Sequence, residues 1–104
     1  MELEKISEYA KGDLEEIVTT YVWEPIDENG ERHDVTLRIE VRRKVSGKYY
    51  AIPSHQAESP QQAAPYFTMD EKDTPEDALY YCISGLKKHM RTAEETQWPL
   101  LKCK

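Results

Sequence analysis

The feature that most constrains the fold is a strict alternation of apolar and polar residues over positions 35–45. Apolar residues occupy the odd positions and polar residues the even ones: Val35, Leu37, Ile39, Val41 and Val45 against Thr36, Arg38, Glu40, Arg42 and Lys44. A period of two is the side-chain period of a β-strand, so the odd face is expected in the core and the even face in water. The buried face requires a second layer of structure to cover it.

A hairpin is predicted to follow this strand. Ser46-Gly47 is interpreted as a two-residue turn, and Pro53 ends the second strand because it lacks the N–H that a ladder uses. The predicted partners are Val45 with Lys48, Arg43 with Tyr50, and Val41 with Ile52. This register places Tyr50 and Ile52 in the core and Tyr49 and Ala51 on the outer face.

An earlier strand is indicated over residues 14–23, where "LEEIVTTYVW" is dense in β-branched and aromatic residues. Pro25 closes it, and a loop over 25–33 contains the turn-forming pair Asn29-Gly30. Residues 14–53 are therefore predicted to form an antiparallel β-meander of three strands.

A helix is predicted over residues 75–91. Thr74 has the side chain of an N-cap, Pro75 suits the first helical position, and acidic residues follow in the first turn. The apolar residues at helical spacing are Ala78, Leu79, Cys82, Ile83, Leu86 and Met90. Their stripe is expected to cover the apolar face of the sheet.

The remaining segments are less regular. A short N-terminal helix is indicated over 2–10. Residues 54–72 form a long loop in which 65–69 is the candidate for a fourth strand, and residues 92–104 form a tail. Together the elements predict one α+β domain, 1–104, in two layers: a three- to four-stranded antiparallel meander with a C-terminal helix on one face.

Composition limits the compartment and the partners. The 104 residues have a formal net charge of −6, no stretch near the ~20 apolar residues that span a bilayer, and two cysteines, Cys82 and Cys103. Two cysteines are too few for a disulfide scaffold, so free thiols in a cytoplasmic protein are expected, with no membrane contact.

The charge is segregated along the chain. Residues 1–31 carry two bases against ten acids, whereas residues 32–48 carry six bases against two acids. The candidate binding residues are Arg38, Arg42, Arg43, Lys44, Lys48 and Tyr49, and we call the five bases among them the basic stripe. Cations beside an aromatic suit a phosphate or a single-stranded nucleic acid. The alternatives are a solvated back face of the sheet, or pairing with the acidic N-terminal segment in the same or a second copy.

No motif in the sequence dictates a chemistry. His33, His55 and His89 are not spaced as zinc ligands, and the acids over 70–77 are explained by the dipole of the helix that follows them. Nucleophile and phosphate-loop motifs are also missing among the 104 residues. We therefore expect no catalytic residue, metal site or cofactor, and an enzyme is the least supported reading.

Exposed aromatic and apolar residues near the C-terminus suggest an interface. The candidates are Tyr81, Trp98, Leu100 and Leu101. The first hypothesis is a non-enzymatic binding or accessory module that contacts a protein or a second copy of itself. The alternatives are nucleic-acid or phosphate-ligand binding through the basic stripe, and a small hydrolase or metal enzyme.

Two segments also resemble a known family. "GKYYAIP" followed by "DTPEDALYYCISGLKKHM", within residues 47–90, is similar to the strand-then-helix segment of HicB-type antitoxins. The chain departs from that pattern in its longer linking loop and in lacking a short glycine-bearing stretch before the helix. A strand followed by a capped helix is common to many α+β domains, so the resemblance implies the local fold and no function.

Overall fold

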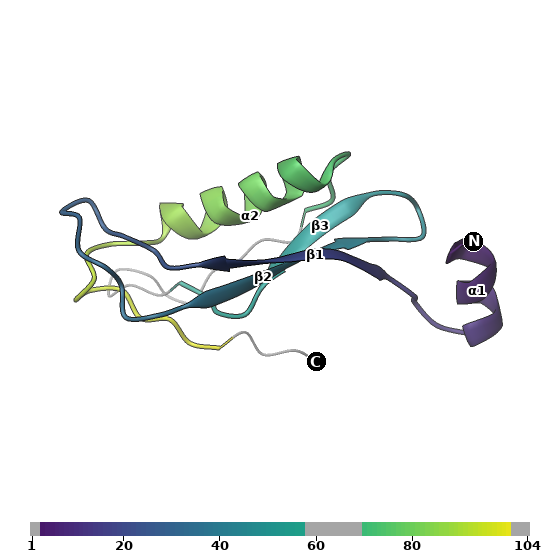
Figure 1. The fold of residues 1–104 in the computed structure, drawn as a ribbon, viewed down its shortest axis with the longest axis horizontal. Helices are drawn as coiled ribbons and strands as arrows, with labels where there is room; N and C mark the ends of the chain where they lie inside the picture. Colours follow the sequence, from purple (N-terminus) through teal and green to yellow (C-terminus); the bar gives the residue numbers. More distant parts are fainter. Residues whose placement is uncertain (1–2, 58–69, 101–104) are drawn as a thin grey trace.

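The structure, a computed structural model, describes residues 3–57 and 70–100. Its elements are α1 (Leu3–Ala10), β1 (Glu16–Trp23), β2 (Leu37–Arg43), β3 (Tyr49–Pro53) and α2 (Pro75–Lys88). The strands form one antiparallel sheet in the order β1-β2-β3, and α2 lies across one face of it (Figure 1). This arrangement is the α+β fold class that the sequence predicts.

The core lies between β2 and α2, as the alternation in β2 predicts. Leu37, Ile39 and Val41 have no exposed surface, and they pack in one cluster with Cys82 and Leu86 of the helix. The even residues of β2 lie on the opposite face and are exposed or half-buried. We call the face that α2 covers the helix face and the opposite one the far face.

The predicted register of the β2–β3 hairpin is wrong by one residue. Val41 pairs with Ala51 rather than Ile52, and Arg43 pairs with Tyr49 rather than Tyr50. The reason is a three-residue turn: Lys44 N–H donates to the Lys48 carbonyl, Gly47 N–H donates to the Lys44 carbonyl, and Gly47 has φ +89°.

The shift exchanges the two faces of β3. Ala51 lies on the helix face and is 2% exposed, and Tyr49 packs against the core cluster, although both were expected on the outer face. Tyr50 and Ile52, expected in the core, instead lie on the far face opposite Arg42 and Glu40, although Tyr50 is still buried there, with 7% of its surface exposed. A one-residue slip necessarily moves every side chain of a strand to the other face.

The start of α2 is as predicted. Thr74 Oγ1 accepts the N–H of Asp77 at 3.1 Å, and Pro75 is the first helical residue. The helix ends at Lys88, three residues before the predicted end, because His89 takes a non-helical conformation while its N–H still donates to the Leu86 carbonyl. Met90 therefore lies beyond the helix.

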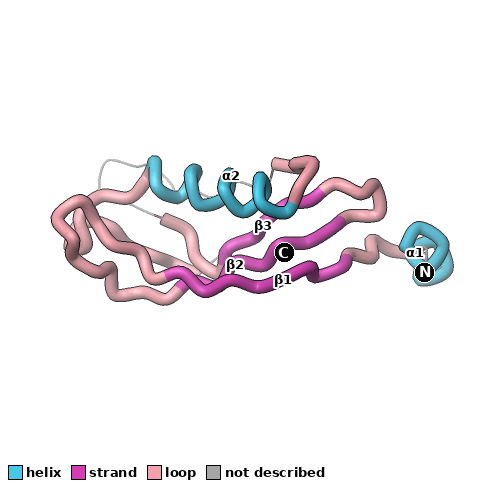
Figure 2. Tube along the Cα trace, turned by 45° about the horizontal axis from the view of Figure 1, so that its top comes forward, coloured by secondary structure: helices cyan, strands magenta, loops and turns pink. Residues whose placement is uncertain are grey.

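The N-terminal part of the chain packs least. Helix α1 buries none of its residues and lies beyond the start of β1, at the opposite end of the molecule from the end of α2 (Figures 1 and 2). The suggested strand at 65–69, together with Leu101 and Cys103, falls outside the described residues. In the described part of the chain neither helix has the length and apolar character needed to cross a bilayer.

Candidate protein-binding surface

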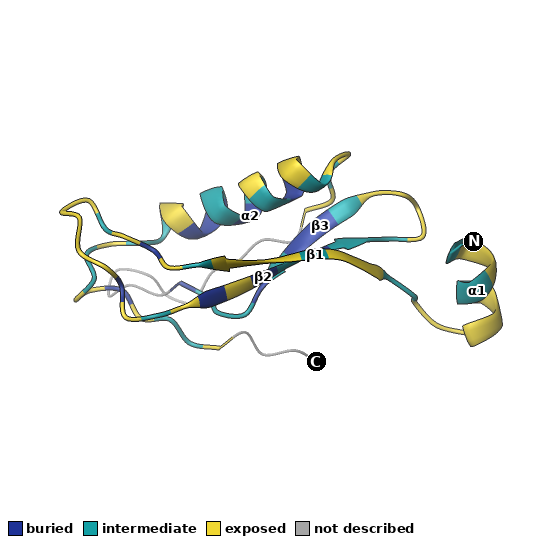
Figure 3. Ribbon diagram, viewed as in Figure 1, coloured by how far each residue is buried: buried dark blue, intermediate teal, exposed yellow. Residues whose placement is uncertain are grey.

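Strand β1 is the least covered part of the sheet. Most of its residues are exposed, whereas the residues of β2 beside it are mostly buried or half-buried (Figure 3). Four apolar side chains are exposed there by 41–64%: Ile17, Val18, Tyr21 and Val22. We call these four residues the β1 patch. Exposed apolar residues that cluster in one place, rather than scattered singly, indicate a contact surface.

The patch reaches both faces of the sheet. Helix α2 packs on β3 and β2, so it leaves the helix face of β1 uncovered (Figure 2). Tyr21, which pairs with the fully buried Ile39, is 42% exposed for this reason. Val22 pairs with Arg38 on the far face and is 64% exposed.

The hydrogen-bonding direction of β2 is fixed by its hairpin with β3. Lys44 N–H donates to the Lys48 carbonyl, and Ser54 N–H donates to the Arg38 carbonyl, both at 2.8 Å. The even residues of β2 therefore bond toward β3. Since the direction alternates residue by residue along an antiparallel strand, the odd residues of β2 bond toward β1.

The same alternation leaves an open row of backbone groups on β1. Thr19, Tyr21 and Trp23 pair with odd residues of β2 and bond inward. The N–H and C=O groups of Thr20 and Val22 consequently point away from the sheet. No strand in the described part of the chain lies beyond β1 to receive them.

The basic stripe is largely neutralised within the molecule. Four of its five bases lie within 4 Å of a carboxylate: Arg42 with Glu40 (2.7 Å) and Glu15 (3.3 Å), Arg43 with Glu16 (3.8 Å), Lys44 with Glu71 (2.8 Å), and Lys48 with Asp73. Arg32, which precedes the stripe, pairs with Glu24 at 3.3 Å. Three of these acids belong to the acidic N-terminal segment, so intramolecular pairing, one of the three readings, is what the structure contains.

The candidate nucleic-acid residues are divided between the two faces. Arg38 and Arg42 share the far face, where Lys44 Nζ lies 5.5 Å from the ring centroid of Tyr50, whereas Arg43 pairs with Tyr49 on the helix face. The side chain of Arg38 is exposed and makes no ion pair with any described residue. A phosphate would therefore meet one free guanidinium rather than a cluster of cations.

A polar network covers part of the far face. The hydroxyl of Tyr50 donates to Glu15 Oε1 at 2.6 Å, and Arg42 bridges Glu15 to Glu40. Burial raises the pKa of the Tyr50 hydroxyl, and the hydrogen bond to Glu40 raises that of Arg42. These polar groups find their hydrogen-bond partners within the network, so the network stabilises the sheet and leaves no unpaired charge among these residues for a ligand.

The C-terminal candidates fold back onto the domain. Trp98 packs edge-on against Trp23 at 6.2 Å between ring centroids, and its indole N–H donates to His33 Nδ1 at 3.2 Å. The hydroxyl of Tyr81 donates to Asp70 at 3.0 Å. Leu100 remains 67% exposed, although it forms a β-bridge with His55.

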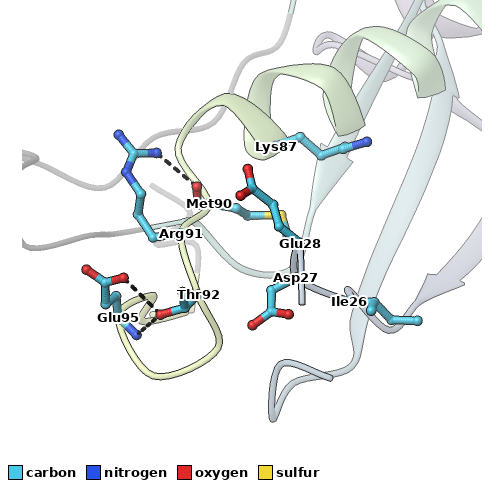
Figure 4. Close-up of a pocket in the computed structure, with 8 residues that line it drawn as sticks. All are labelled: Ile26, Asp27, Glu28, Lys87, Met90, Arg91, Thr92 and Glu95. Atoms are coloured by element: carbon cyan, nitrogen blue, oxygen red, sulfur yellow. Dashed lines mark hydrogen bonds between the residues drawn. The ribbon is translucent and has the colours of Figure 1, made fainter. Parts of the chain in front are cut away.

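A cleft of about 460 Å³, lined by both polar and apolar side chains, lies where the 26–28 loop meets the end of α2 (Figure 4). Asp27 organises this region: its carboxylate accepts the N–H groups of Asn29, Glu31 and Ala93, each at 2.9 Å. The bond from Ala93 is the main cause of a lowered Asp27 pKa. Arg91 donates to the Met90 carbonyl at 2.9 Å, and the bond from Ala93 to Asp27 joins the two segments of the chain that line the cleft.

Within residues 3–57 and 70–100, titratable side chains do not gather into a metal site. No three His, Cys, Asp or Glu side chains in this part lie close enough to bind one metal ion. Cys82 is a free thiol in the core, and burial raises its pKa to about 12, which leaves it protonated and unreactive.

The β1 patch is not among the interface residues that the sequence predicts. The segment Ile17–Trp23 is seven residues long and contains no charge, proline or glycine, in a chain where 33% of residues are charged. The pattern predicts a strand there but does not say whether that strand lies at the centre or at the edge of a sheet. Its position at an edge follows from the pairing order, which a single strand pattern does not reveal.

Comparisons with known proteins bring no further constraint. No protein-family model, no curated protein and no solved structure matches this chain. The fold defines the described part of the chain as a small α+β domain in which β1 is an open edge of the sheet. Any functional conclusion therefore rests on the residues exposed at its surface.

Proposed function

We propose that the protein is a non-enzymatic binding module that contacts other proteins through β1. The observation that supports this most is the open edge of β1, where the outward N–H and C=O groups of Thr20 and Val22 lie among the exposed side chains of the β1 patch. The partner chemistry that fits is an extended, uncharged segment of chain that adds as a further strand.

The other edge of the sheet does not offer the same surface. Tyr49 of β3 exchanges both backbone hydrogen bonds with Lys72, at 2.7 and 2.8 Å, so part of that edge is already paired. The free buried thiol of Cys82 fits a reducing compartment, and we place this function in the cytoplasm.

Site-specific photo-crosslinking tests the proposal. A photoreactive phenylalanine analogue replaces Val22 in the full chain in cells, and the same analogue replaces Tyr80, which is 76% exposed on α2, as a matched control. We expect a covalent protein adduct at position 22, mapped by mass spectrometry to an extended segment of the partner, and none at position 80. Equal adducts at both positions, or none at position 22, would contradict the proposal.

A further inference from the structure

We infer that the strand added to β1 is β1 of a second copy, which joins two three-stranded sheets into one antiparallel sheet of six strands. This inference rests on the proposed function and names its partner. Two identical edges related by a two-fold axis pair antiparallel. In such a pairing the numbers of two opposite residues always add up to the same sum. The question is which register the strand allows.

The bulge in β1 limits the choice. The pairing of β1 with β2 shifts between Ile17 and Thr19, so the ladder is regular from Thr19 to Trp23. A register centred on Tyr21 uses that regular stretch alone. It places the Tyr21 residues of the two copies opposite each other and Thr20 opposite Val22 of the second copy.

The backbone groups match this register. Thr20 and Val22 are the residues of the regular stretch whose N–H and C=O groups point outward. Opposite one another, they exchange two hydrogen bonds on each side of the two-fold axis, which gives four bonds in all. The side chains also suit one another, since Tyr21 meets Tyr21 on the helix face and Thr20 meets Val22 on the far face.

The charges at the ends of β1 exclude one neighbouring register. A register centred on Thr20 would bring Glu16, which lies beyond the bulge, within about one position of Glu24 of the second copy, which is repulsive. Centring on Tyr21 places Glu24 opposite the uncharged Val18 instead. Each acid also has its own cation, Arg43 for Glu16 and Arg32 for Glu24, so the ends of the paired strands carry both signs.

A pairing of this length buries less area than a standard stable interface, so the dimer is expected to dissociate on dilution. Sedimentation of the purified chain from micromolar to millimolar concentration should show a shift from 12.2 kDa toward twice that mass. Val22→Pro removes an N–H that bonds only outward, so the fold is retained and the dimer is lost. Tyr80→Ala, on the exposed side of α2, should dimerise as the wild type does.

The register has its own test in a Cys103→Ser background. Tyr21→Cys places two cysteines opposite each other across the axis with Cα atoms about 4.5 Å apart, within disulfide range. Val22→Cys places them about 8 Å apart and out of reach. We expect a covalent dimer under mild oxidation from the first variant and not from the second.

Two outcomes would overturn the inference. One is a wild-type chain that stays at 12.2 kDa up to millimolar concentration, and the other is a dimer that Val22→Pro leaves intact. A strict monomer whose position 22 still crosslinks to a different protein in cells would reject the second copy as partner and leave the proposed function standing. A monomer with no such adduct would reject both.

Discussion

His33 is a single residue whose protonation state is tied to the packing of the C-terminal segment. It is 1% exposed, its Nδ1 accepts the indole N–H of Trp98, and its Nε2 has no hydrogen-bond partner among the described residues. Because Nδ1 accepts, the ring proton of the neutral form is on Nε2. Burial lowers the pKa of His33, since the desolvated site disfavours the charged ring.

This lowered pKa predicts a loss of stability in mild acid. The unfolded chain, with a His pKa near 6.5, takes up the proton first as the pH falls. The contribution of His33 to the free energy of unfolding is therefore fully present above about pH 6.5. It is lost as the pH falls from 6.5 through the lowered pKa of the folded state, and the loss is at most about 1.4 kcal/mol per pH unit.

Urea denaturation at pH 7, 6 and 5 measures this effect. The wild type should lose more stability over this range than His33→Gln, which keeps a polar side chain but does not titrate. The comparison removes the contributions of His55 and His89, which both proteins share. Equal pH dependence in the two proteins would show that His33 titrates normally in the fold.

Among the elements, the β2–β3 hairpin depends on one glycine. Gly47 has φ +89°, and a Cβ built there would meet no atom within 4 Å, so any cost of a side chain comes from the backbone alone. Gly47→Ala should lower the free energy of unfolding by about 1–2 kcal/mol. Gly12→Ala is the matched control, since Gly12 is equally open and lacks a positive φ, and it should leave stability unchanged or slightly raised. Equal losses would contradict the turn geometry.

The N-cap of α2 gives a second prediction for an element. Thr74→Ala removes the side-chain acceptor of the Asp77 N–H and should lower the free energy of unfolding by about 1 kcal/mol, measured by urea denaturation. Thr74→Ser keeps the acceptor and should retain most of that stability. A Thr74→Ala variant as stable as the wild type would remove the cap from the account of this helix.

The sequence predicts those features of the fold that local patterns determine. The alternation in β2 and the cap at Thr74 were sufficient for the core and the start of α2. The register failed because Ser46-Gly47 is compatible with both a two-residue and a three-residue turn, and the conformation of Gly47 decides between them. The exposure of Tyr21 was out of reach for another reason, since it depends on where α2 lies across the sheet, and that of Val22 depends on β1 being an edge strand.

At the scale of the whole molecule, the segregated charges of the sequence meet in space. Arg42 and Arg43 of β2 form ion pairs with Glu15 and Glu16, and Arg32 pairs with Glu24, so acids of the N-terminal segment lower the positive potential available to a phosphate. The net charge of −6 acts in the same direction. Nucleic acid is therefore not the expected partner.

Fluorescence anisotropy with a labelled single-stranded oligonucleotide checks this prediction. At low salt, where phosphate contacts are strongest, the wild type should show no saturable binding. Arg38→Glu, which removes the one exposed guanidinium of the stripe that has no described ion pair, should give the same trace. Saturable binding that weakens with added salt and is lost in Arg38→Glu would contradict the account.

The central claim is that the edge of β1 is open in one copy and closed by pairing with a second. Residue-resolved amide hydrogen exchange, measured at a low and a high protein concentration, tests it most directly. At low concentration Tyr21 and Trp23 should exchange slowly because β2 protects them, and Thr20 and Val22 should exchange fast. At high concentration Thr20 and Val22 should become slow as well. Fast exchange of Thr20 and Val22 at every concentration would contradict the pairing, and slow exchange of both at the lowest concentration would contradict the open edge.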